Sequence, residues 1–151
     1  MARILESVTL QQRFGRLPTV TFATGDIVLE AGTSTGRLYI LQAGSVEVVK
    51  DGTTIGLFAE PGTIFGELAA LLDEPHTADV RALEPSSFHV APAAELLSRD
   101  PLATLYVAVT LARRLNDANR ALVELRQEAE AVEAPDSTRI RLDELRDTFF
   151  F

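Results

Sequence analysis

The chain contains no cysteine among its 151 residues, which excludes disulfides, thiolate metal sites and cysteine nucleophiles. The two histidines, His76 and His89, lie far apart in the sequence and lack the spacing of paired zinc ligands. Long apolar runs are missing as well. None approaches the roughly 18 residues that cross a bilayer, and the N-terminal segment has no signal-peptide core. We therefore expect a cytoplasmic protein with no metal and no membrane partner.

Positive charge is also scarce. Lys50 is the only lysine, and 14 basic residues face 22 acidic ones, which gives a net charge of -8. The phosphate backbone of nucleic acid attracts clustered lysine and arginine, so direct binding to DNA or RNA is not expected. An enzyme is not expected either, because the sequence shows no nucleophile–base pair, metal cluster or Walker-type loop.

Residues 20–90 contain short β-type runs separated by turns, which is typical of a sandwich, barrel or roll. The clearest signal is Asp51-Gly52 between Val46–Lys50 and Thr53–Phe58, a pattern that predicts a hairpin. Further strands are expected at residues 27–29, 38–41, 79–83 and 87–90. The predicted fold class is α+β: an antiparallel β-roll of jelly-roll type with an N-terminal helix, a short helix within the roll and a long C-terminal helix.

The expected helices cover residues 1–17, 65–72, 92–97 and 100–134. Pro18 and Pro135 follow the first and the last of these, and Pro92 suits a first helical turn. Asp100 is the expected N-cap of the long helix. We take residues 1–134 as one domain and residues 135–151 as a short tail.

An apolar seam runs along the long helix with alternating spacings of three and four residues. Its members are Ala108, Leu111, Leu115, Ala118, Leu122, Leu125, Ala129 and Val132. A seam of about three heptads favours pairing with a second copy, so a homodimer through residues 108–132 is predicted. The alternative is that the stripe packs on the chain's own β-roll. In the tail, we expect the aromatic triplet 149–151 to be docked on the domain or on a partner.

The segment from Gly62 to Ala82 combines residue types that suit a phosphorylated sugar. A helix that begins after Gly66 presents free backbone N–H groups, which favour a phosphate, and glycine lets a ligand approach the backbone closely. Glu67 can accept hydrogen bonds from a sugar hydroxyl, and Thr77 adds a hydroxyl of its own. The alternative for Glu67 is an ordinary exposed carboxylate at a helix N-terminus.

This segment, with Phe65-Gly66-Glu67-Leu68-Ala69 at its centre, resembles the cyclic-nucleotide-binding domain family, of the type found in catabolite activator protein and protein kinase A regulatory subunits. Supporting pieces are Gly25-Asp26, Glu30-Ala31-Gly32 and residues 38–44, and the resemblance covers about residues 15–130. It implies that cAMP or cGMP binds as a regulatory ligand. The implied site comprises Phe65, Gly66, Glu67, Leu68, Ala69, His76, Thr77, Ala78 and Asn119.

Within the implied site, the resemblance gives each residue a role. Gly66 and Leu68 would offer backbone donors to the cyclic phosphate, and Glu67 would bind the ribose 2′-hydroxyl. Thr77 and Ala78 would complete the phosphate pocket. On the long helix, a polar residue would contact the base.

His76 departs from the family pattern, which has an arginine at this position. An arginine would pair with the phosphate through a permanently charged fork, whereas histidine is mostly neutral at pH 7. Losing a charge-assisted hydrogen bond costs on the order of 1.5–3 kcal/mol. His76 could instead be a surface loop residue, and Asn119, the candidate for the base contact, could be plain helix surface. His89 is expected to be a satisfied core or edge residue.

Two functions fit these expectations. The first is a cyclic-nucleotide sensor, in which the ligand orders the segment from Gly62 to Ala82, called the cassette below, and shifts the long helix toward a partner protein that the sequence does not identify. The second is a degenerate dimeric scaffold that binds no nucleotide. A transcription factor is not expected, because too few residues follow Pro135 for a helix-turn-helix domain.

Overall fold

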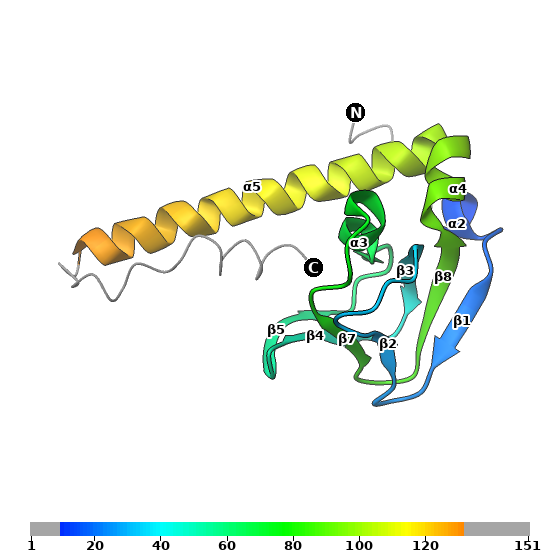
Figure 1. The fold of residues 1–151 in the computed structure, drawn as a ribbon, viewed down its shortest axis with the longest axis horizontal. Coiled ribbons are helices and arrows are strands. Elements are labelled where there is room, and N and C mark those ends of the chain that lie inside the picture. Colours follow the sequence, from blue (N-terminus) through cyan, green and yellow to red (C-terminus); the bar gives the residue numbers. More distant parts are fainter. Residues whose placement is uncertain (1–9, 132–151) are drawn as a thin grey trace.

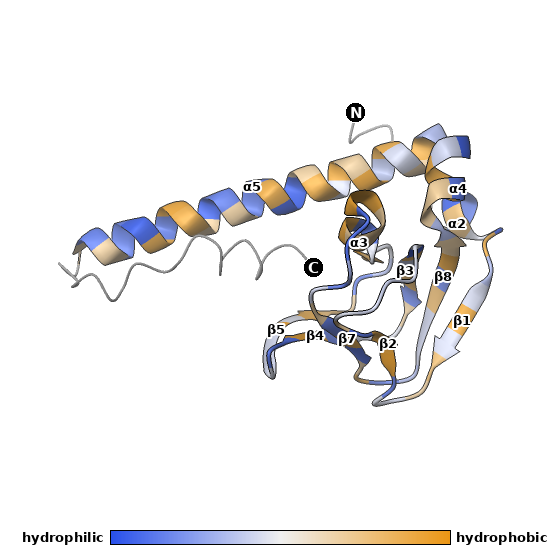
Figure 2. Ribbon diagram, in the orientation of Figure 1, coloured by the Kyte–Doolittle hydropathy of each residue, from blue (hydrophilic) through white to orange (hydrophobic). Residues whose placement is uncertain are grey.

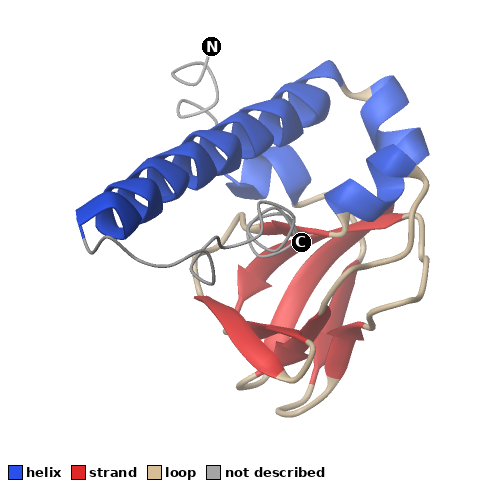
Figure 3. Ribbon diagram, turned by 60° about the vertical axis from the view of Figure 1, so that its left-hand side comes forward, coloured by secondary structure: helices blue, strands red, loops and turns tan. Residues whose placement is uncertain are grey.

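The computed structural model describes residues 10–131 and consists of a β-roll with helices gathered on one side of it (Figures 1 and 3). One sheet contains, in spatial order, β1 (Thr19–Phe22), β8 (Ser86–Pro92), β3 (Arg37–Ala43) and β6 (Ile64–Phe65). The other contains β2 (Ile27–Leu29), β7 (Asp79–Ala82), β4 (Val46–Lys50) and β5 (Thr53–Phe58). All recorded strand pairs are antiparallel, so the predicted α+β roll is confirmed.

The predicted hairpin joins β4 to β5. Asp51 and Gly52 have φ angles of 49° and 77°, and two successive positive values are what a tight hairpin turn of the I′ class requires. Strands β3 and β8 are longer than the sequence predicted, because pairing with each other extends both past their apolar runs.

The core has two parts that follow from the alternation of β3. Tyr39 and Leu41 lie between the two sheets in a cluster that includes Phe65 and Phe88. Their neighbours Leu38 and Ile40 belong to a second cluster, which the helices cover. Because successive side chains of a strand point to opposite faces, one strand joins the roll core to the helical layer.

The helices are α2 (Leu10–Phe14), α3 (Glu67–Leu72), α4 (Ala93–Arg99) and α5 (Pro101–Ala131). Asp100 caps α5 as predicted, since its Oδ1 accepts hydrogen bonds from the N–H groups of Leu102 and Ala103, each at 3.1 Å. Two predicted starts were wrong. Phe65 pairs with β3 in strand β6, so α3 begins only at Glu67, and Pro92 ends strand β8 rather than opening α4.

Some expectations lie outside the described residues. They concern the helix over residues 1–9, the last part of the long helix at 132–134, and the tail. Within residues 10–131, no helix is both long and apolar enough to span a bilayer.

The residues of the apolar seam on α5 differ in how far the rest of the chain covers them. Leu111 is partly buried against the cluster under the helices, whereas Leu115, one turn further, is 50% exposed. Beyond that point α5 extends away from the roll, with apolar and polar residues alternating along it (Figure 2). The β-roll therefore covers the start of the seam but not Leu115.

Candidate functional site

Gly66 is the pivot between strand β6 and helix α3. Its φ of 87° lies in the left-handed region that favours glycine. A Cβ atom at this position would lie 2.7 Å from the backbone carbonyl oxygen of Arg37, closer than real Cβ atoms come. Both the turn and the close approach of β3 therefore require glycine here.

Glu67 is the most deeply buried charged residue of the predicted site. Its side chain is 0% exposed, and its Oε1 pairs with a guanidinium nitrogen of Arg114, which α5 contributes. Another nitrogen of the same guanidinium, Nη2, donates to the carbonyl oxygen of Ile64 at 2.7 Å. The alternative of an ordinary exposed carboxylate is therefore wrong.

Arg114 is the residue that the sequence reasoning missed. It lies on the long helix, five residues before Asn119, the candidate for the base contact. The sequence does contain a signal for it, because a buried carboxylate needs a cation, and Arg113-Arg114 is a basic pair on the long helix shortly before Asn119.

Burial sets the protonation of Glu67. It raises the pKa of Glu67 from its usual 4.5 to about 7, although the charge and hydrogen bond of Arg114 act in the opposite direction. The second carboxylate oxygen, Oε2, is buried and has no hydrogen-bond partner among the described residues. Buried polar atoms are normally bonded, so this oxygen is an acceptor available to a ligand hydroxyl.

The raised pKa of Glu67 predicts how stability depends on pH. A carboxyl group whose folded pKa exceeds its unfolded value contributes stability that is present below about 4.5 and is lost as the pH rises through about 7. We expect the free energy of unfolding of wild type, relative to Glu67→Gln, to fall by up to about 3 kcal/mol between pH 4.5 and 8. Urea unfolding of both proteins across this range measures it, and parallel profiles would contradict it.

His76 is held beside Gly66. Its backbone N–H donates to the carbonyl of Thr33, and its carbonyl accepts from the N–H of Gly32, both at 2.8 Å. The residue is 7% exposed, and its Nε2 lies 3.4 Å from the hydroxyl of Thr35. Burial lowers the pKa of His76, which favours the neutral ring at pH 7. The alternative of a surface loop residue is therefore wrong.

The remaining predicted residues are only partly brought together. Ala78 is buried in the same core cluster as Phe65, while Thr77 is exposed in the bend that precedes β7. Leu68 and Ala69 are half-buried on α3. Asn119 is exposed on α5, five residues beyond Arg114, and within residues 10–131 no hydrogen bond joins its side chain to the cassette.

His89 differs from its prediction. The side chain is buried in β8, but its Nδ1 has no hydrogen-bond partner in the described part of the chain. It is thus a core residue with one nitrogen unsatisfied.

Helix α5 contacts the cassette a second time through Tyr106. The hydroxyl of Tyr106 donates to the carbonyl of Gly62 at 2.8 Å, and Arg114 bonds the carbonyl of Ile64 two residues further. Two side chains of one helix therefore hold the segment that leads into Gly66.

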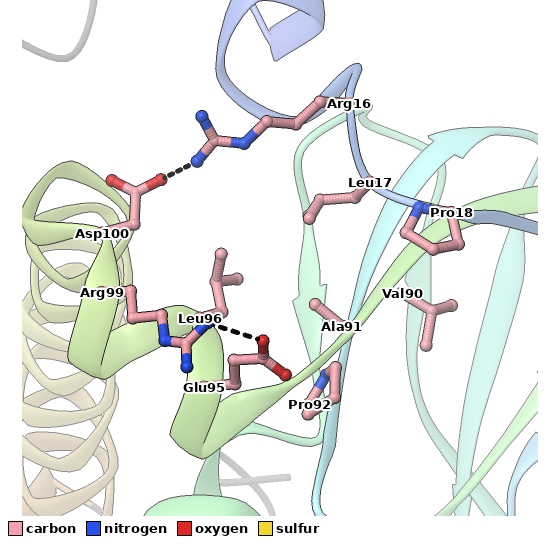
Figure 4. A pocket seen from close by; sticks show the side chains of 10 residues that line it. All are labelled: Arg16, Leu17, Pro18, Val90, Ala91, Pro92, Glu95, Leu96, Arg99 and Asp100. Atoms are coloured by element: carbon pink, nitrogen blue, oxygen red, sulfur yellow. Dashed lines mark hydrogen bonds and ion pairs between the residues drawn. The ribbon is translucent and has the colours of Figure 1, made fainter.

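A cavity of about 340 Å³ lies elsewhere, between β8, helix α4 and the link from α2 to β1 (Figure 4). Its floor is apolar, with Leu17 and Val90 among the lining residues. The charges at its rim are already paired, as in the bond of Arg16 to Asp100 at 2.8 Å. The buried acceptor of Glu67 therefore makes the cassette the stronger candidate for a polar ligand. In residues 10–131, no three His, Asp or Glu residues are grouped as for a metal ion.

A buried carboxylate beside a glycine pivot, with a helix bonded to that carboxylate and to the carbonyls of Gly62 and Ile64, is typical of a ligand-binding domain. Residues 19–98 match the model of the cyclic nucleotide-binding domain, and the chain belongs to this family. The family is a regulatory, ligand-binding one rather than a catalytic one.

Known relatives agree with this assignment. A cAMP-dependent protein kinase regulatory subunit of Debaryomyces hansenii is 32% identical over 115 residues, which are 67% of this chain and 25% of that protein. A cGMP-dependent protein kinase of Plasmodium berghei is 37% identical over 62 residues, 41% of this chain and 7% of the kinase. The crystal structure of Thermus thermophilus catabolite activator protein superposes with a TM-score of 0.63 at 28% identity, covering 75% of this chain and 56% of that one. This chain spans a quarter or less of the two curated relatives named.

Proposed function

We propose that this domain binds a cyclic nucleotide, cAMP or cGMP, as a regulatory ligand. The observation that carries the proposal is the unpartnered Oε2 of Glu67, a buried acceptor in a family whose ligands contain a ribose hydroxyl. The hydroxyl would donate to this oxygen while Oε1 stays paired with Arg114. The cyclic phosphate would lie against Gly66, Leu68 and Thr77.

Binding at Glu67 would reach α5 through Arg114. The helix is bonded to the cassette at Gly62, Ile64 and Glu67, so a ligand that reorients Glu67 alters one of these bonds directly. Differential affinity of the ligand for two positions of α5 is what allows it to shift their populations. An effector protein that contacts α5 in only one of these positions would therefore bind more or less tightly when the nucleotide is present.

The test is isothermal titration of the purified protein with cAMP and, separately, with cGMP. Glu67→Gln should weaken whichever nucleotide binds, because it replaces the charged acceptor. Heat of binding with wild type that is lost or reduced in the variant supports the proposal. Saturating nucleotide that produces neither heat nor a thermal shift would overturn it.

A second candidate is a dimeric scaffold that binds no nucleotide. The neutral, buried His76 favours it, because the cassette then lacks the permanent charge that a family arginine supplies. The same titration decides between the two, since a scaffold gives no heat with either nucleotide.

Both candidates act as a homodimer through residues 108–132. Leu115 is exposed in the single chain, although it belongs to a heptad seam. We expect Leu115→Glu with Leu122→Glu to convert dimers into monomers, because two charges per helix would be buried in the seam. Sedimentation velocity measures the change, and Arg120→Glu, at a position facing away from the seam, is the control. A double variant that still sediments as a dimer would contradict this prediction.

A further inference from the structure

A cyclic phosphate carries one negative charge, and the cassette offers it little positive charge. His76 is buried and has no charged partner among residues 10–131, and its burial favours the neutral ring. Arg114 is already bonded to Glu67 and to the carbonyl of Ile64. If the proposed function is correct, another group must supply the attraction that the missing arginine would have provided.

Arg37 lies next to Gly66, where the cyclic phosphate is proposed to bind. Its carbonyl oxygen is the atom nearest to the missing side chain of Gly66, and the His76 ring is the next residue around that glycine. The hydroxyl of Thr35 links the two residues, because it accepts from the Arg37 N–H at 3.3 Å and lies 3.4 Å from Nε2 of His76. Arg37 therefore begins β3 on the rim of the loop that holds His76.

The alternation of β3 also fixes the face on which Arg37 lies. Leu38 belongs to the cluster under the helices, whereas Tyr39 and Leu41 belong to the core between the sheets. Residue 37 is thus on the inner face of the roll, at the end where the strand reaches the cassette.

Among the described residues, no acidic side chain pairs with the guanidinium of Arg37. The residue is exposed, and in the described part of the chain its guanidinium has no ion pair or hydrogen bond. The other charged groups near the cassette are mostly carboxylates, among them Glu30 and Glu74 on exposed loops.

We propose that Arg37 is the phosphate-binding cation of this site and takes over the role that His76 cannot fill. This assignment rests on the proposed function and deepens it, because it specifies an anionic ligand and the residue that recognises its charge. A guanidinium at the rim can reach the ligand from outside, whereas the family arginine would lie in the cassette itself.

The experiment compares five proteins by calorimetric titration with the nucleotide that wild type binds. They are wild type, Arg37→Gln, His76→Arg, the double variant Arg37→Gln with His76→Arg, and Arg120→Gln as a charge-matched control on the exposed face of α5. Arg37→Gln should weaken binding by about ten- to a hundredfold, the usual worth of a charge-assisted hydrogen bond. The control should bind like wild type, and the double variant should regain most of the affinity, because one cation is present again.

The single variant His76→Arg makes the rescue decisive: if Arg37 and an arginine at residue 76 serve the same phosphate, His76→Arg should tighten binding more in the Arg37→Gln background than in wild type, whereas a merely structural role of Arg37 would give the same gain in both. Unchanged affinity of Arg37→Gln would overturn the assignment and leave the proposed function standing. A double variant that binds as weakly as Arg37→Gln would overturn it as well. If wild type binds neither cAMP nor cGMP, the proposed function fails and this assignment fails with it.

Discussion

Replacing Arg114 with leucine should lower the free energy of unfolding by about 3–5 kcal/mol, the usual cost of removing one partner of a buried ion pair. Glu67 would remain fully buried with both oxygens unpaired, and the carbonyl of Ile64 would lose its donor. The loss should be largest at pH 8, where Glu67 is mostly ionised. Urea unfolding monitored by circular dichroism measures it.

The control for this prediction is the double variant with Glu67→Gln. If the buried charge causes the loss, neutralising Glu67 should recover at least half of the stability that Arg114→Leu removes, and the two substitutions should be strongly non-additive. Additive losses would mean that Arg114 acts mainly through packing of its side chain. A loss below about 1 kcal/mol, the range of exposed pairs, would show that the pair is open to water in solution.

Replacing His76 with arginine should tighten nucleotide binding by about ten- to a hundredfold. The guanidinium stays charged at every working pH and adds a charge-assisted bond to the phosphate. His76 itself can contribute such a bond only when it is protonated. Because burial lowers its pKa in the free protein, this contribution should be small at neutral pH and should grow as the solution becomes more acidic.

Both His76 and Glu67 change their protonation with pH, so the contribution of His76 to the pH dependence of binding has to be separated from that of Glu67. The ratio of wild-type affinity to that of His76→Gln isolates the histidine, and it should rise as the pH falls from 7 to 5. The ratio of His76→Arg to His76→Gln should stay flat over the same range. A wild-type ratio that does not change with pH would mean that His76 does not contact the phosphate.

The sequence predicted the roll and most of its strands, because these depend on local patterns. Asp51-Gly52 determines a hairpin wherever it lies between two apolar runs, and the cap at Asp100 depends on the residues that follow it. The family resemblance also singled out the segment around Gly66 and Glu67, whose role as a ligand site stays a prediction. The errors at Phe65 and Pro92 arose where tertiary strand pairing overrides local helix signals.

The contacts between distant residues of the site could not be predicted from the sequence, because they depend on tertiary packing. Arg114 and Glu67 are 47 residues apart, and only the packing of α5 over the cassette brings them together. The same is true of Arg37, which becomes a neighbour of Gly66 because β3 pairs with β6. Asn119 has suitable chemistry but lies too far along the helix axis from these contacts, by roughly 7.5 Å from Arg114.

Tyr106 and Arg114 fasten α5 to the cassette, so they also fix the rotation of the helix about its own axis relative to the roll. Each residue of an α-helix turns about 100° and advances about 1.5 Å, so the direction in which the seam faces is determined by how many residues separate it from these two bonds. One residue inserted between Leu115 and Leu122 would leave both bonds intact but rotate the remainder of the seam by about 100°. Seven inserted residues would nearly restore the direction and move the far end by about 10.5 Å. In the proposed dimer, the number of residues between these two bonds and the seam therefore determines how one roll is oriented relative to the other. The identity of the apolar side chains in the seam does not affect this orientation.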